Sequence, residues 1–135
     1  MPRENTQKKF VSYKPVLLVA DDAQGSGNSI PANAKVAVVT GVTNGTNDFI
    51  VLPSVASCPI GHEIVILNSA SSNFELRTPS ASAEEINSED CDGTKELLMT
   101  DTQIVRVVKI SDSIGWMAEG RTAIGAYATA VVPDA

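Results

Sequence analysis

The single histidine, His62, is the first residue to consider for catalysis, because imidazole is the side chain that most readily exchanges protons near neutral pH. The sequence supplies no second imidazole and no His-Glu-x-x-His pattern that would hold a zinc ion. It also has no Gly-x-Ser-x-Gly elbow that would present a nucleophilic serine. We therefore expect His62, which follows Gly61 at the start of an apolar run, to form hydrogen bonds at the solvent edge of a strand.

The second place where chemistry is conceivable is the acidic stretch 84–92, which has five carboxylates. Its Ser-x-Asp-x-Asp-Gly pattern from residue 88 matches the start of a calcium-binding loop. The bidentate carboxylate at the twelfth position would be Met99, so the stretch is not an EF-hand. Three alternatives stay open: a looser calcium site, a solvated loop, and a contact with a basic patch on a neighbouring subunit.

Other catalytic patterns are weaker still. Glycoside hydrolysis needs two carboxylates across a cleft, and nothing in the sequence singles out such a pair. The glycine-rich residues 25–27 lack the Lys-Ser/Thr that a phosphate-binding loop requires. Trp116 is a candidate for stacking on a sugar, but a place in the core is the stronger expectation. The sequence therefore predicts a protein that is not an enzyme, with no cofactor and no resident metal ion.

The charge distribution is uneven. The chain has a formal net charge of −6, yet its first 14 residues carry a net +3, which leaves −9 on the remainder. An acidic body argues against nucleic acid as a partner, because phosphates are neutralised by clustered Lys and Arg. The basic N-terminal arm suits an acidic protein partner, with a solvated, frayed terminus as the alternative.

Two of the six aromatic residues lie between the charges of this arm. An extended arm that adds a strand to a neighbouring sheet would bury Phe10 and Tyr13 there. The alternative is that both begin the first strand of the chain's own sheet. The predicted partner-binding residues are Arg3, Lys8, Lys9, Phe10, Tyr13 and Lys14.

Many Val, Ile and Thr residues, with Gly, Asn, Ser and Asp at short intervals, favour strands over helices. Residues 63–67 are apolar at successive positions, which indicates a strand buried between two layers. Residues 73–77 alternate, which indicates one buried and one wet face, and the turn at 69–72 would pair them with the preceding strand. The other expected strands are 16–19, 36–39, 48–52, 96–99, 103–110 and one containing Trp116.

These elements predict an all-β fold: a single antiparallel β-sandwich or barrel domain at residues 34–135. Residues 1–33 would form an extended N-terminal arm and a lead-in loop, and residues 123–130 an extended tail. No apolar segment follows Met1 that would serve as a secretory signal, and no apolar run is long enough to span a bilayer. We therefore expect synthesis in a cytosol, no membrane partner, and free thiols at Cys58 and Cys91.

The segments also follow a characteristic order along about half of the chain. They are Ile-Val-Leu-Pro-Ser at 50–54, Gly-His-Glu-Ile-Val-Ile-Leu-Asn at 61–68, Phe-Glu-Leu-Arg-Thr-Pro at 74–79, Glu-Ile-Asn at 85–87, and a polar turn at 111–115 before Trp116. This order resembles a β-domain of bacteriophage structural proteins, among them head decoration or cement proteins and tail fibres. The acidic insertion after residue 87 and the Ala/Thr-rich end depart from that pattern.

The resemblance implies a bacteriophage head decoration or cement protein. Such a protein would assemble in the host cytoplasm, form a homotrimer, and bind the outer surface of the major capsid protein lattice in the virion. The alternative that the resemblance implies is a tail-fibre or spike component that binds a host receptor. Fibres usually carry longer shaft repeats, and this sequence has none.

Overall fold

The computed structural model describes residues 14–44, 48–80, 82–92, 95–121 and 130–131. Every regular element within these ranges is a strand, apart from one 3-10 turn, η2 (Val55–Ser57). The prediction of an all-β fold is confirmed. No helix in these ranges is long and apolar enough to cross a membrane.

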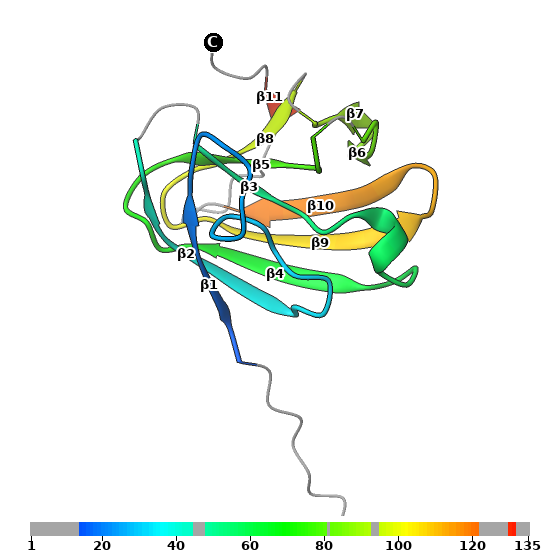
Figure 1. Cartoon of the computed structure of the whole chain (residues 1–135), viewed down its shortest axis with the longest axis horizontal. Helices are drawn as coiled ribbons and strands as arrows, with labels where there is room; N and C mark the ends of the chain where they lie inside the picture. Colours follow the sequence, from blue (N-terminus) through cyan, green and yellow to red (C-terminus); the bar gives the residue numbers. More distant parts are fainter. Residues whose placement is uncertain (1–13, 45–47, 81, 93–94, 122–129, 132–135) are drawn as a thin grey trace, which may run out of the picture.

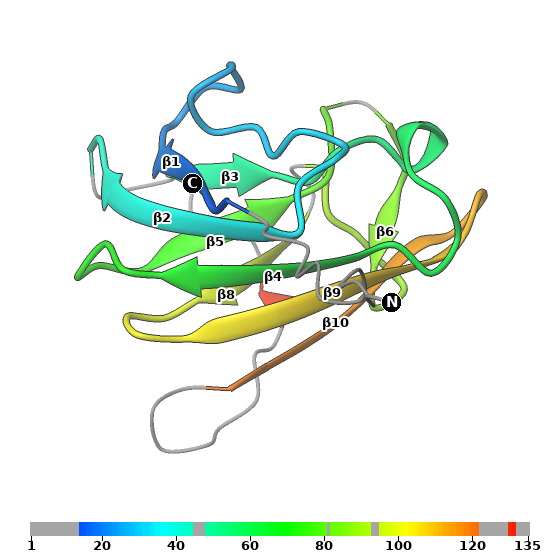
Figure 2. The same cartoon turned by 90° about the horizontal axis from the view of Figure 1, so that it is seen from below.

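The strands form two sheets that lie in separate layers (Figure 1). In a second view, β2, β4 and β9 of the large sheet lie in front of β3, β5 and β8 of the small sheet (Figure 2). The large sheet has the order β1 (Val16–Ala20), β2 (Val36–Val42), β4 (Glu63–Asn68), β9 (Ile104–Ser111), β10 (Gly115–Arg121), β6 (Glu85–Ile86), β7 (Glu89–Asp90). The small sheet has the order β11 (Ala130–Val131), β8 (Glu96–Met99), β5 (Phe74–Arg77), β3 (Phe49–Val51).

The first half of the chain stacks like the turns of a solenoid. It passes from β2 in the large sheet to β3 in the small sheet, then back to β4 and on to β5, so that β4 lies parallel to β2 and β5 parallel to β3. One earlier turn precedes these two, because β1 pairs in parallel with β2 and Ser29 forms a parallel bridge to Val51. The result is a solenoid-like stack that uses both sheets.

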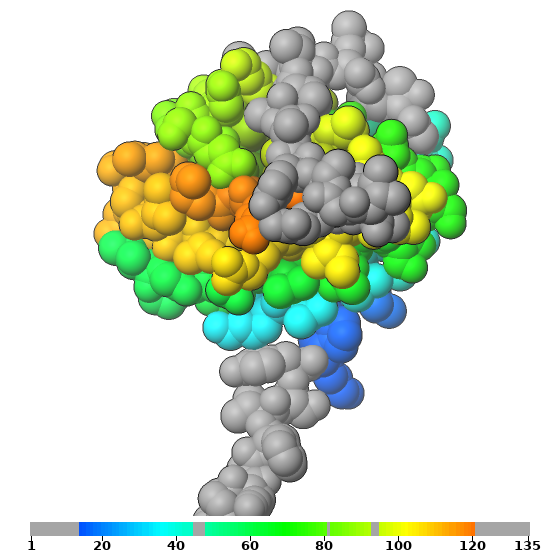
Figure 3. All heavy atoms as spheres, turned by 180° about the vertical axis from the view of Figure 1, so that it is seen from behind, coloured from blue at the N-terminus to red at the C-terminus, as the bar shows by residue number. Residues whose placement is uncertain are grey.

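The second half of the chain closes this stack with antiparallel strands. β9 pairs with β4, β10 returns beside β9, and β8 pairs with β5. From behind, segments of β2, β4, β9 and β10 follow one another from cyan to orange (Figure 3). The expectation of a simple antiparallel sandwich or barrel is therefore wrong. Among the described strands, four pairs are parallel. The pairs β1–β2, β2–β4 and β3–β5 are parallel because the chain leaves each sheet and re-enters it in the same direction.

The hydrophobic core draws on both sheets and excludes water from the largest apolar side chains. Trp116 of β10 is completely buried, as predicted, and it lies in one cluster with Phe74 of β5. Burying apolar surface at about 25 cal/mol per Å² is the main driving force for such a fold. Small residues also belong to the cluster, among them Ala20 of β1 and Ala37 of β2.

The positions of the expected strands are confirmed, but two of the inferences drawn from their patterns are wrong. Strand β4 is not buried on both faces, since Val65 and Leu67 point outward and are partly exposed. In β5, by contrast, Phe74, Glu75 and Leu76 are all buried, so neither face is wet. Strand β5 also does not pair with β4, because the turn at 69–72 carries the chain into the other sheet, where β5 lies between β3 and β8.

A short hairpin that the sequence did not predict joins β6 to β7. Its two turn residues, Asn87 and Ser88, have φ angles of 55° and 68°, as a two-residue type I′ turn requires. The hairpin is held against β10, where Asn87 accepts from the Ala118 N–H at 2.7 Å and donates to its carbonyl at 3.2 Å. Gly115 is needed at this junction, because its φ is +119° and a Cβ there would lie 2.6 Å from the Glu85 carbonyl oxygen.

Candidate interaction surface

The outer face of the large sheet exposes many apolar side chains. Strand alternation sends every second residue of β1, β2, β4, β9 and β10 away from the core. Leu17 is 69% exposed, Ile104 51% and Met117 47%. The apolar residues of this outer face are Leu17, Val19, Val36, Val38, Val65, Leu67, Ile104, Val108, Ile110 and Met117. Exposed apolar side chains gathered on one face of a protein in this way mark an interaction site.

The strand register aligns four of these residues in one row. Leu17 lies opposite Val38, Val38 opposite Leu67, and Leu67 opposite Ile104. The row therefore crosses four neighbouring strands without a charged residue. Adjacent strands are about 4.8 Å apart, so the row spans roughly 14 Å.

A groove of about 430 Å³ lies at the Leu67–Ile104 end of this row. Strands β2, β4 and β9 contribute its apolar lining, and the turns that follow β4 and precede β9 contribute polar groups. The lining residues are Val38, Leu67, Asn68, Ser69, Ser71, Asp101, Thr102, Gln103 and Ile104.

The polar side of the groove is held in place by side chains that bond to the backbone. The Asn68 amide donates to the Ser72 carbonyl at 2.8 Å and to the Thr100 carbonyl at 2.9 Å, and it accepts from the Ala70 N–H. The Gln103 side chain accepts from the Thr100 N–H at 2.9 Å. These bonds fix both turns before any partner arrives, which reduces the entropy lost on binding.

The charged residues of the outer face are few. Arg106 donates to Glu63 at 2.9 Å, and both side chains are about half exposed. An exposed pair of this kind contributes roughly 0–1 kcal/mol to stability. The ion pair therefore does little to hold the fold together, and the exposed Glu119, which lies opposite Arg106 across β9 and β10, adds a further negative charge to this face.

The histidine that the sequence singled out is placed for structure. His62 is 7% exposed, so it lies inside the molecule and not at the solvent edge that we expected. Its Nε2 lies 3.1 Å from the Ala34 carbonyl, which can only accept, so Nε2 donates and Nδ1 accepts from Lys35 Nζ at 3.4 Å. Both ring nitrogens thus join the start of β4 to the segment that leads into β2.

The acidic stretch 84–92 does not converge on one point. Glu84 turns inward and accepts from the Val55 N–H at 3.0 Å, whereas Glu89 pairs with Lys95 at 2.7 Å. Burial raises the pKa of Glu84, while the Val55 N–H and the charge of Lys109 act in the opposite direction. In the part of the chain that the structure describes, no group of three or more His, Cys, Asp and Glu side chains is arranged to hold a metal ion.

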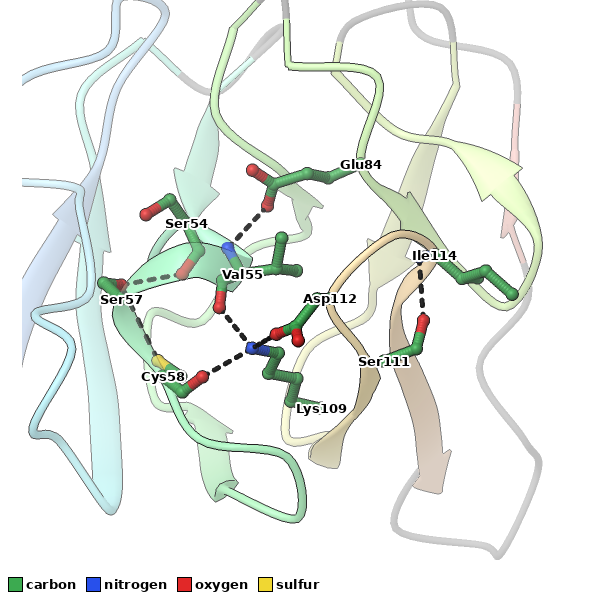
Figure 4. A network of polar contacts seen from close by, with 9 residues as sticks. All are labelled: Ser54, Val55, Ser57, Cys58, Glu84, Lys109, Ser111, Asp112 and Ile114. Carbon is green, nitrogen blue, oxygen red and sulfur yellow. Dashed lines mark hydrogen bonds and ion pairs between the residues drawn. The ribbon is translucent and has the colours of Figure 1, made fainter.

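Lys109 lies near Glu84 in a network of polar contacts (Figure 4). Its burial was not predicted from the sequence. Lys109 is 2% exposed, and its ammonium donates to the Val55 and Cys58 carbonyls at 2.5 Å each and to Asp112 at 2.6 Å. These bonds use all three of its donors, so the ammonium joins the 3-10 turn to the β9–β10 turn. The signal in the sequence was its inward position, two residues after Val107.

A second cluster of buried charged side chains lies on the outer face of the small sheet. Glu96 is fully buried and forms an ion pair with Arg77, whose guanidinium also lies 4.0 Å from the centre of the Phe49 ring. Glu75, on the same face, is 6% exposed. Within the described residues, the second carboxylate oxygen of Glu96 has no hydrogen-bond partner. The pairing of Arg77 with Glu96 follows from their register across β5 and β8 and could not be read from the sequence.

Both cysteines are free, as expected, and both are buried. The pKa of the Cys91 thiol is raised to about 11, chiefly by burial; the carboxylates of Glu89, Asp90 and Glu96 act in the same direction, and a hydrogen bond with the Ile86 backbone acts against it. Nucleophilic chemistry needs the thiolate, so Cys91 is unreactive at neutral pH.

The predicted partner-binding residues fall mostly outside the described residues. Arg3, Lys8, Lys9, Phe10 and Tyr13 belong to that part of the chain, so their predicted role stays a prediction. Lys14 is described and exposed, and it lies two residues before β1, the edge strand of the large sheet. The expected extended tail at 123–130 lies outside the described residues except for Ala130.

Comparison with protein families finds no family model that matches this chain, and comparison with curated proteins finds none that matches it.

Proposed function

We propose that this chain is a bacteriophage head decoration protein that binds the outer surface of the major capsid protein lattice and stabilises the mature shell. The observation that carries the proposal is the exposed apolar outer face of the large sheet. A protein with no other use for this face would have polar residues on it, because exposed apolar surface promotes aggregation. The order of the sequence segments resembles that of phage β-domains. This resemblance is the reason for proposing a phage capsid as the assembly to which the face binds.

The charge distribution supports a non-enzymatic binding role. An acidic body stays soluble and repels other copies, while the basic arm seeks an acidic surface. In this proposal, the basic side chains of the arm, Arg3, Lys8, Lys9 and Lys14, contact acidic groups on the capsid. The body, which begins with β1 at Val16, then remains outside as a single domain, in a homotrimer.

Stabilisation of the shell follows from mass action. A ligand that binds only the mature lattice lowers the free energy of that lattice in proportion to the logarithm of its concentration over Kd. A decoration protein therefore needs no catalytic residue. It needs a rigid surface, and the outer face of the large sheet, whose strands are held in register by backbone hydrogen bonds, provides one.

A second candidate function, a tail-fibre or spike component that binds a host receptor, is favoured by one observation. The parallel stacking of β1, β2 and β4 is the architecture that solenoid proteins extend into long binding surfaces. In that case the chain would be present in a few copies per particle, confined to the tail.

Binding to expanded phage heads tests the proposal. We expect the purified protein to sediment with heads, at a copy number comparable to that of the major capsid protein. Replacing Lys8 and Lys9 together with Gln should weaken binding about tenfold, because two charges that face an acidic surface are lost.

Lys95→Gln is the matched control, since it removes a positive charge from the body and should leave head binding unchanged. A protein that does not bind heads, or that is found only at the tail, would overturn the decoration proposal. Tail location with receptor binding would support the second candidate instead.

A further inference from the structure

We propose that the groove beside Leu67 and Ile104 receives the aromatic part of the N-terminal arm, residues 8–14, of a second copy of this chain. The inference deepens the proposed function by naming the contact between subunits. It rests on that function only for the number of copies in the assembly.

The groove offers what aromatic side chains require. Val38, Leu67 and Ile104 form its apolar side, and 430 Å³ is within the range of pockets that bind drug-sized molecules. Phe10 and Tyr13 each have about 150–250 Å² of surface to bury. Buried aromatic anchors of this kind supply most of the binding energy in interfaces.

The charges of the arm and the body are complementary. Asp101, which is exposed, contributes to the lining of the groove, and serine hydroxyls and carboxamide oxygens supply further acceptors. A segment with a net charge of +3 would thus meet a body of −9, which favours correct encounter and orientation.

The direction of the strands favours a second copy over the arm's own groove. The arm enters β1 at Val16, from the side of the sheet where the parallel strand β4 begins, whereas the groove lies around Leu67 at the carboxyl end of β4. An arm that continued the line of β1 would carry Phe10 away from its own groove by about 3.3 Å per residue. Binding to its own groove would require the arm to reverse and cross β2, but a neighbouring copy needs no reversal.

Each copy has one arm and one groove, so the contact is heterologous: one surface binds a different surface. Heterologous contacts close into a ring when the rotation between neighbours allows it. In a ring of three copies, every arm would occupy the groove of a neighbour and no groove would be left empty. This agrees with the homotrimer proposed above.

Subunit complementation tests the inference with full-length chains. The groove variant is Ile104→Asp, and the arm variant replaces both Phe10 and Tyr13 with Ala. Each should weaken self-association at least about 30-fold in sedimentation velocity, the effect of losing one strong anchor. A mixture of the two variants should form a heterodimer but no ring, because one intact arm and one intact groove allow a single contact between the two variants.

Ile110→Asp is the matched control for the groove. It makes the same change on the same face of β9, at 40% exposure, but outside the groove. It should associate like the unsubstituted chain. Equal thermal unfolding of Ile104→Asp and Ile110→Asp would show that neither result comes from misfolding.

Three results would overturn the inference: a monomeric unsubstituted chain, variants that associate normally, or a mixture that forms no heterodimer. The last result would indicate a symmetric contact between two outer faces. Head binding is measured separately, so the two proposals can fail independently. Loss of association with normal head binding in the variants would leave the decoration proposal standing, and association without head binding would leave only the arm contact.

Discussion

The outer faces of the two sheets reverse the usual relation between polarity and burial. On the large sheet the outer face is apolar and exposed, with Leu17 at 69%. On the small sheet the outer face carries Glu75, Arg77 and Glu96, yet Glu96 is fully buried. Residue type alone therefore does not tell which side of a strand is wet, because burial depends on what covers the sheet. The large sheet is left with a surface for a partner, and the small sheet with an internal charge cluster.

The two faces also differ in what their ion pairs contribute. The Arg106–Glu63 pair on the large sheet is hydrated and screened by salt. The Arg77–Glu96 pair on the small sheet has lost most of its water, so each charge depends on the other. Removing one partner should therefore have very different effects on the two faces.

The largest expected effect comes from Arg77→Met, which leaves the Glu96 carboxylate buried without its partner. We expect the free energy of unfolding to fall by about 3–5 kcal/mol. The matched change on the other sheet, Arg106→Met, should cost no more than about 1 kcal/mol, because Glu63 remains in water. Urea unfolding of the two variants measures both values. Equal losses would show that the two outer faces do not differ in solvation.

A smaller effect is expected from Cys91, on which the carboxylate of Glu96 also acts. The folded-state pKa of about 11 exceeds the ordinary value of 9.0, so folding favours the neutral thiol. The resulting stability is present below pH 9 and is lost as the pH rises through 11. The loss should be on the order of 2–3 kcal/mol.

Cys91→Ala isolates this contribution, since the other groups that titrate in the same range remain. The unfolding free energy of the variant should fall less steeply between pH 9 and 11 than that of the unsubstituted chain. Parallel curves would mean that the pKa of the thiol is the same in the folded and unfolded states. In that case neither burial nor the nearby carboxylates would raise it.

The smallest effects are expected from replacing one valine with the isosteric threonine on the outer face of each sheet. Val51→Thr places a hydroxyl on the buried outer face of β3, where Val51 is 2% exposed, and should lower the unfolding free energy by about 1–2 kcal/mol. Val19→Thr on β1, where Val19 is 44% exposed, should change it by less than about 0.5 kcal/mol. Thermal unfolding of the pair would contradict the assignment of the faces if Val19→Thr were the more harmful change.

The sequence predicted where the strands lie much better than what surrounds them. The extent of β9 and the burial of Trp116 follow from local pattern, because β-branched runs and turn residues act over a few positions. The burial of β5 does not, since it depends on the sheet to which the chain crosses after residue 68. The hairpin of β6 and β7 was missed because strands of two residues leave no pattern to detect.

The candidate surface shows the same limit. The sequence identified apolar residues such as Val65 and Leu67, but interpreted them as core. Their alignment with Ile104 depends on a register between strands far apart in the chain, which no local pattern records. Lys109 was overlooked for the opposite reason, because a lysine is assumed to be exposed unless the fold brings acceptors to it.

The solenoid-like stack has a consequence for the order of folding. Its parallel pairs join residues far apart in sequence, such as Val36 with Val65, whereas β9 and β10 are joined by a short turn. Closing a long loop costs more entropy before any contact forms, so we expect the β9–β10 hairpin to form early and the parallel turns to add later. Substitutions in the hairpin should then slow folding, while those in the parallel turns should mainly speed unfolding. The two halves of the chain would thus control separately how quickly the fold is reached and how long it lasts.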